Sequence, residues 1–172
     1  MSAVEFVVYG RPATAGSKRA FAIRLGDGRF TGRVAVTDDS SRTKSWQATV
    51  ASAALETGSG CSRGPLALTL AFYLHRPRHH YGTGRNSSRV RDAAPARPAV
   101  RPDLLKLTRA VEDALTGILW HDDAQVCDEH LAKHYAADDE PERVVIRIEP
   151  LEESSARLSP LDPIPGQLEI AA

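Results

Sequence analysis

Long apolar runs and cysteines are both scarce in this 172-residue chain. It has no run of about 18 apolar residues, which excludes a membrane-spanning helix. The opening residues, MSAVEFVVYG, lack the basic start and apolar stretch of a secretion signal, so we expect a cytoplasmic protein. Its two cysteines, Cys61 and Cys127, form no CxxC or Cys/His metal pattern, and we expect ordinary reduced thiols.

The net charge is zero, but the charges are unevenly distributed along the chain. Residues 1–109 hold 18 of the 22 Lys and Arg and 7 of the 22 Asp and Glu, a balance of +11. Residues 110–172 carry the opposite balance, −11. The basic part is suited to a polyanion; the alternative is that the two parts neutralise each other in the fold.

Hydrophobic periodicity predicts two main helices and five strands over residues 1–151. Residues 11–25, rich in Gly, Pro and Arg, are expected to form a basic loop. We expect helices at 40–56 and 104–116, and strands at 5–10, 33–39, 65–74, 125–136 and 143–151.

Two segments have few apolar residues and are not expected to form regular elements. Residues 75–102 are rich in Arg, Pro, Gly and Ser, which predicts a mobile basic surface loop. Its three histidines, His75, His79 and His80, suggest a metal site, but a solvated loop is the favoured interpretation. Residues 152–172, rich in Ser, Pro and acidic residues, are expected to be a disordered tail.

The predicted helix at 104–116 contains one residue out of pattern. Asp103 follows Pro102 and is placed to cap the helix by accepting backbone N–H bonds. The core face is expected to carry Leu104, Leu107, Val111, Ala114 and Leu115. The opposite side carries Arg109, Glu112 and Asp113, and also the apolar Leu105.

Carboxylates lie at both ends of this helix. Twelve helical residues advance about 18 Å, and six extended residues can cover about 20 Å. An antiparallel return would therefore bring Asp122 and Asp123 beside Asp103, where oxygen ligands would suit Mg²⁺ or Mn²⁺, and the carboxylates of Asp103 and Asp123 are expected to lie within about 6 Å of each other. The alternative is that Asp103 is only a cap and that HDDAQ is only a turn.

The order RPD (101–103), DALTG (113–117), DDAQV (122–126) and a later lysine resembles the RusA family of Holliday-junction resolvases, or crossover junction endodeoxyribonucleases. Members of that family typically show KPDxDNLxK, DALNG and DDAQI. The resemblance covers about residues 65–135. It implies a small α+β fold, a homodimer and Mg²⁺-dependent cutting of branched DNA, such as four-way junctions, in recombination and repair. It marks Asp103 and Asp123 as metal-binding, and places Arg109 and Lys133 at the positions of the family's two lysines.

The sequence departs from the family pattern at the second aspartate, where Leu105 stands, and at the following asparagine, where Lys106 stands. Glu112 lies about 10 Å further along the helix, too far to share an ion with Asp103. Asp122 is a nearer replacement ligand; the alternative is that Lys106 places a positive charge near the scissile phosphate. The alternative to a nuclease is a catalytically impaired protein that still binds branched DNA.

Cations near these motifs are expected to contact DNA phosphates. Arg109 can grip two phosphate oxygens, and would stabilise the transition state or only position the backbone. The expected DNA-binding residues are Arg11, Lys18, Arg19, Arg101, Lys106 and Lys133.

Overall fold

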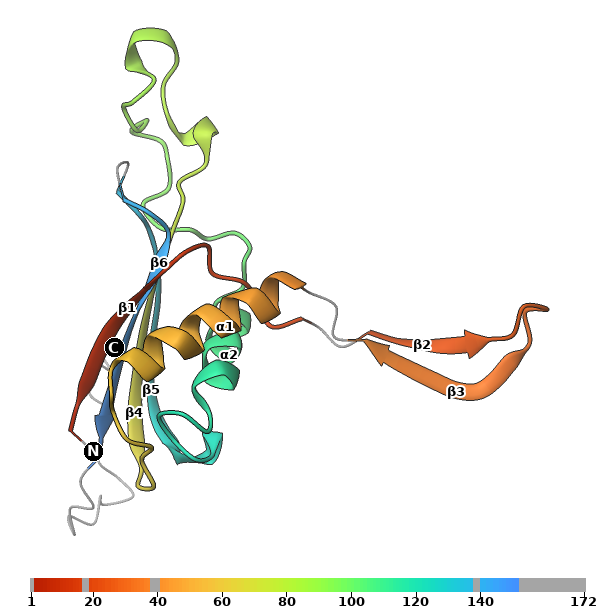
Figure 1. The fold of residues 1–172 in the computed structure, drawn as a ribbon. Helices are drawn as coiled ribbons and strands as arrows, with labels where there is room; N and C mark the ends of the chain where they lie inside the picture. The colour runs from red at the N-terminus through yellow and green to blue at the C-terminus, as the bar shows by residue number, and fades with distance from the viewer. Residues whose placement is uncertain (1, 17–18, 38–40, 138–139, 152–172) are drawn as a thin grey trace, which may run out of the picture.

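The computed structural model describes residues 2–16, 19–37, 41–137 and 140–151 (Figure 1). The elements confirm the predicted α+β class: two helices, a mixed four-stranded sheet and a smaller two-stranded sheet. Lys18 and the predicted tail at 152–172 lie outside the described residues. The elements are β1 (Val4–Tyr9), β2 (Arg19–Arg24), β3 (Phe30–Thr37), α1 (Ser41–Glu56), β4 (Leu66–Leu74), α2 (Leu104–Leu115), β5 (Val126–Tyr135) and β6 (Arg143–Pro150).

The main sheet has the strand order β1–β6–β4–β5. β6 pairs antiparallel with β1 and β4, whereas β5 pairs parallel with β4 and forms one edge. A parallel neighbour requires a crossover connection, and α2 lies within the segment that connects β4 to β5. The chain enters α2 at one end of the sheet and leaves it at the other (Figure 1).

The hydrophobic core lies between this sheet and the two helices. Alternate residues of β4 are buried, as expected for a strand with one core face. On α2, Leu107, Val111 and Leu115 are completely buried and Leu104 is partly buried, which confirms the predicted core face. Each fully buried leucine contributes about 1.5–3 kcal/mol of hydrophobic free energy, so this packing fixes α2 against the sheet.

β2 and β3 form an antiparallel ribbon that is separate from the main sheet. Figure 1 shows this ribbon projecting away from the sheet and helices. The prediction of a loop over residues 11–25 was therefore wrong for Arg19–Arg24. A ribbon strand gains its backbone hydrogen bonds from its partner strand and needs no core face, so it has no strong burial pattern in the sequence.

Residues 75–102 form a second projection, which we call the lobe (Figure 1). It contains two short 3₁₀ helices, at Arg78–His80 and Gly84–Asn86, and an isolated bridge between Tyr81 and Val90. A Cβ atom on Gly82 would lie 2.5 Å from the Asn86 carbonyl oxygen, so this turn requires glycine. The expectation of a segment without regular elements was therefore wrong, because local backbone hydrogen bonds organise it.

None of the helices in the described ranges is long and apolar enough to cross a bilayer. Cys61 and Cys127 are both exposed free thiols. These observations agree with the composition.

Candidate functional site

The N-terminal end of α2 pairs an exposed carboxylate with an ammonium group. Asp103 is the N-cap residue, but its side chain makes no capping hydrogen bond. Its Oδ2 atom instead lies 3.6 Å from Lys106 Nζ, and the two side chains are 57% and 49% exposed. Because the carboxylate is not used to satisfy the helix backbone, it remains accessible to a ligand from solvent.

Lys133 fixes the chain that leads into Asp103. Its Nζ atom donates to the carbonyl oxygens of Val100, at 3.0 Å, and Pro102, at 2.8 Å. Lys133 is near the end of β5, and therefore β5 runs back along α2 and ends beside the helix N-terminus. A shallow hollow of about 680 Å³ is lined by Val100, Arg101, Asp103, Lys106 and Lys133.

The C-terminal end of α2 holds the DDAQ motif. Asp123 Oδ1 accepts a hydrogen bond from Thr116 Oγ1 and another, at 3.2 Å, from Nε1 of the buried Trp120. Asp122 caps the short 3₁₀ helix Asp123–Gln125 by accepting from the backbone N–H of Ala124 at 2.9 Å. Both aspartates are exposed, and both belong to this compact turn.

Asp103 and Asp123 therefore lie at opposite ends of α2, and the predicted separation of about 6 Å within one chain is wrong. Asp103 is the N-cap, whereas Asp123 is bonded to Thr116, the C-cap. The twelve residues of α2 lie between these caps, which are thirteen steps and about 20 Å apart along the axis. The antiparallel return is made by β5 and not by residues 117–122, because Gly117 N donates to Trp120 O at 2.7 Å and closes a tight turn.

Glu112 belongs to the same end of the helix as Asp123. The pKa of Glu112 is raised to about 7, and burial is the largest cause. The charge of Glu129 and a hydrogen bond with Glu129 come next, followed by the charges of Asp123 and Asp113. The prediction that Glu112 is too far from Asp103 agrees with this placement. No three His, Cys, Asp or Glu side chains in the described part of the chain are arranged to hold a metal ion.

We expect the Glu112→Gln protein to lose less stability than the wild type as pH rises. The folded state holds a proton on Glu112 up to about pH 7, whereas the unfolded chain releases it near the ordinary value of 4.5. The folded state thus binds more protons between these values, and the free energy of unfolding falls as pH increases across this window. The loss should be about 1 kcal/mol, because the half-buried group is partly screened by solvent.

Thermal unfolding in EDTA at pH 5 and pH 8 measures this difference. Glu56→Gln, at the exposed end of α1, is the matched control and should follow the wild type. Equal pH dependence in Glu112→Gln and the wild type would contradict the assignment.

The solvent-exposed face of α2 lies between the end that carries Asp103 and the end near Asp123. Arg109 is exposed near the middle of the helix, and Leu105 is 71% exposed beside Asp103. Arg109 is about 9 Å along the axis from Asp103. An exposed leucine at this position gains nothing from burial and offers no ligand to a cation.

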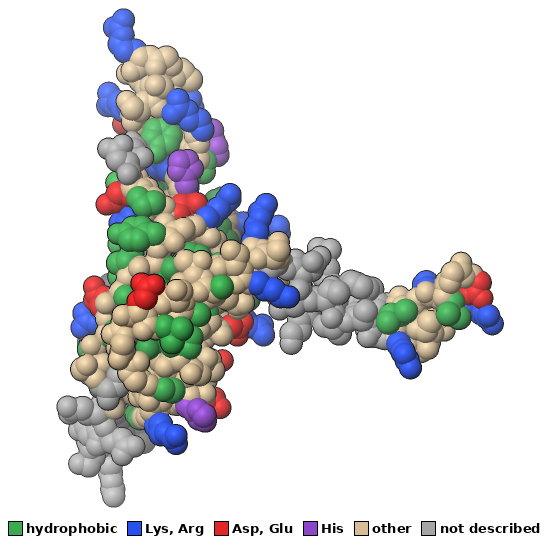
Figure 2. All heavy atoms as spheres, in the orientation of Figure 1, with side chains coloured by type: hydrophobic (Ala, Val, Ile, Leu, Met, Phe, Trp, Pro, Cys, Tyr) green, Lys and Arg blue, Asp and Glu red, His purple; other side chains and the backbone are tan. Residues whose placement is uncertain are grey.

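A larger basic cleft of about 1,100 Å³ lies between the end of β1, the start of α1 and the lobe. Arg11, Arg42 and Arg101 contribute to its lining, with the 61% exposed ring of Tyr9. Glu142 partly offsets this charge, since its carboxylate is 3.9 Å from Arg11 Nε. Figure 2 shows Lys and Arg side chains gathered over the start of α1 and on the lobe.

The predicted residues therefore fall into three groups. Arg11 and Arg101 line the basic cleft, Lys106 and Lys133 flank Asp103, and Asp122 lies with Asp123. Arg19 begins β2. Sequence reasoning missed that Glu112 lies near both Asp123 and Glu129, because this proximity depends on the register of β5 along α2.

The fold and these sites define a small α+β protein with exposed carboxylates and basic surfaces suited to a phosphate backbone. Residues 24–149 match the family model described as endodeoxyribonuclease RusA, and the chain belongs to this family. It is also similar to the uncharacterized protein YqaN of Bacillus subtilis (strain 168), with 27% identity over 150 residues, which cover 86% of this chain and 97% of YqaN.

Proposed function

We propose that this protein cuts four-way DNA junctions by divalent-metal-dependent hydrolysis of phosphodiester bonds. The observation that carries the proposal is the match to the RusA endodeoxyribonuclease family over a span that includes Asp103, Arg109 and Asp123. The exposed Asp103 carboxylate, next to Lys106 and close to the basic cleft, is consistent with a reaction at a DNA backbone. The cytoplasmic location stays a prediction.

One chain alone does not fit a metal ion between Asp103 and Asp123, because α2 separates them by about 20 Å. A homodimer removes this difficulty. When two copies of a helix pair antiparallel about a two-fold axis, the N-terminal end of each lies beside the C-terminal end of the other. Asp103 would then face Asp123 of the partner subunit, and each dimer would contain two such pairs.

In that arrangement, the two carboxylates would hold a divalent cation such as Mg²⁺ or Mn²⁺, which would supply activation of the attacking water. Arg109 stabilises the negative charge that develops on the phosphate, because its guanidinium is always protonated and can donate to two oxygens. Lys133 keeps the backbone before Asp103 in place through its two carbonyl contacts. Arg11 and Arg101 contact the flanking phosphates from the cleft.

The second candidate function is binding of branched DNA without cleavage. Leu105 supplies no ligand, and the ammonium of Lys106 already lies 3.6 Å from Asp103, so this carboxylate is partly neutralised without a metal ion. Leu105 and Lys106 stand where the family has an aspartate and an asparagine, and both differences reduce the attraction of the site for a divalent cation. The basic surfaces that would bind DNA do not depend on this site.

We expect the protein to bind a four-way junction more tightly than linear duplex, and to nick the junction when Mg²⁺ or Mn²⁺ is added. Phosphate contacts release counterions, so affinity should fall steeply, by about a hundredfold or more, between 50 and 200 mM salt. Fluorescence anisotropy in EDTA measures binding, and a gel assay with each ion measures cutting. Junction binding without cutting favours the second function, whereas equal affinity for both DNAs contradicts junction recognition.

A further inference from the structure

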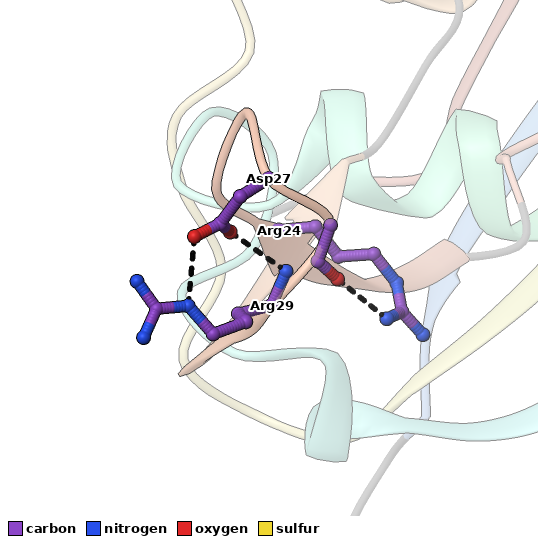
Figure 3. Close-up of polar contacts among 4 residues, drawn as sticks. Arg24, Asp27 and Arg29 are labelled. Atoms are coloured by element: carbon purple, nitrogen blue, oxygen red, sulfur yellow. Dashed lines mark hydrogen bonds and ion pairs between the residues drawn. The ribbon is translucent and has the colours of Figure 1, made fainter.

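The β2–β3 ribbon is ordered at its tip. Leu25 N donates to Arg29 O, and Gly28 N to Leu25 O, both at 2.8 Å, which closes a tight hairpin loop. Gly28 has a φ of +83°, as such loops require at their last residue. Figure 3 shows that Asp27 faces Arg29, and the Asp27 carboxylate accepts a 2.7 Å hydrogen bond from Arg29 Nε. Backbone and side-chain hydrogen bonds from Arg29 lower the pKa of Asp27, so this carboxylate stays charged and offsets the charge of Arg29.

The ribbon extends well beyond the core, and apolar side chains near its tip are exposed to solvent (Figures 1 and 2). Ile23 is 41% exposed, Leu25 is 51% exposed and Phe30 is 54% exposed. An isolated hairpin is only marginally stable by itself. Exposure of its three large apolar side chains to water is unfavourable. The ribbon is thus suited to a partner that covers its tip.

The charge of the ribbon indicates the chemistry of that partner. Residues 19–37 contain four arginines and one aspartate. Arg24 donates to the Gly28 carbonyl at 2.9 Å (Figure 3), a contact that orients its guanidinium without neutralising it. Arg24 is also the cross-strand partner of Phe30, so a basic and an aromatic residue pair across the ribbon. A second copy of this chain would present the same positive ribbon, whereas a polyanion complements it.

A pair of antiparallel strands is narrow enough to enter a DNA groove, and apolar side chains inserted at a base step unstack it. The four-way branch point is the favoured place, because base pairs there have lost a stacked neighbour and the cost of insertion is lower. We propose that the β2–β3 ribbon inserts Phe30 and Leu25 at the branch point of junction DNA, with Arg24 on an adjacent phosphate. This inference rests on the proposed function and adds a separate element for recognising the branch.

A junction carrying 2-aminopurine at its branch point tests the insertion, because the fluorescence of this base rises when it is unstacked. The assay is done in EDTA, so that no DNA is cut. Wild-type protein should raise the fluorescence, and the Leu25→Ser, Phe30→Ser double variant should not. Junction affinity of the variant should fall by about tenfold, the effect of losing one stacked contact. Leu55→Ser, which changes a 66% exposed leucine on α1, is the matched control and should behave as the wild type.

The outcomes separate the two proposals. If the wild type binds the junction tightly without a rise in fluorescence, or if the double variant retains the rise, the insertion is wrong and junction binding stands. If the wild type does not prefer the junction over duplex, both proposals are wrong. If the double variant changes the dimer mass in sedimentation and leaves fluorescence intact, the ribbon contacts a second copy of the chain instead of DNA. Unchanged circular dichroism verifies that the variants fold.

Discussion

The Asp103→Asn protein should bind a four-way junction at least as tightly as the wild type and cut it about a thousandfold more slowly or not at all. Loss of a carboxylate weakens the hold on a divalent ion, and it also removes a negative charge that repels the DNA backbone. Asp123→Asn should behave in the same way. Asp92→Asn, whose side chain in the lobe is 95% exposed, is the matched control and should cut normally.

Mixing the two inactive variants determines where the carboxylates meet. If Asp103 of one chain acts with Asp123 of the partner subunit, a mixed dimer has one site with both aspartates and one site with neither. Random exchange of subunits should then restore roughly a quarter of the wild-type number of sites. Nicking of the junction by the mixture, compared with each variant alone, measures this. An inactive mixture would contradict a site shared between subunits, provided that subunit exchange is verified with tagged chains.

The Leu105→Asp protein should cut junctions about ten- to a hundredfold faster than the wild type, or at a lower concentration of divalent ion. The substitution restores a carboxylate beside Asp103 and places a second negative charge next to Lys106, so this end of α2 attracts a cation more strongly. Because the leucine is 71% exposed, its loss should leave the melting temperature nearly unchanged.

Titration of nicking rate against Mg²⁺ and Mn²⁺ provides the measurement. Leu55→Asp is the control, since it adds the same charge on an exposed part of α1. A variant that cuts when the wild type never does would show that the natural protein binds junctions without cutting them. An unchanged dependence on both ions would contradict a metal site at this end of α2.

The parts of the fold that sequence could predict are those with one buried and one exposed face. β4 alternates between buried and half-buried residues, and α2 places leucine and valine on its core face, so both elements were visible as periodicity. The β2 strand has no core face and was missed. Asp103 was correctly placed at the start of α2, because a proline and an aspartate before an apolar helix mark an N-terminus.

The separation of Asp103 and Asp123 could not be derived from chain length alone. Residues 117–122 are long enough to span the helix if extended, but hydrogen bonds within the turn, from Gly117 to Trp120, keep them at its C-terminal end. The buried Trp120 then positions Asp123 through its indole N–H. Both hydrogen bonds join residues three positions apart, and neither leaves a repeating signal in the sequence.

The ribbon and the lobe leave the body in different directions (Figure 1). A straight, stiff duplex lying along one of these projections leads away from the other, and bending it to reach both costs elastic energy. A branched DNA already has helices that diverge from one point and can occupy both projections without being bent. We therefore expect the outline of a single chain to contribute to discrimination between branched and linear DNA before any base or metal ion is involved.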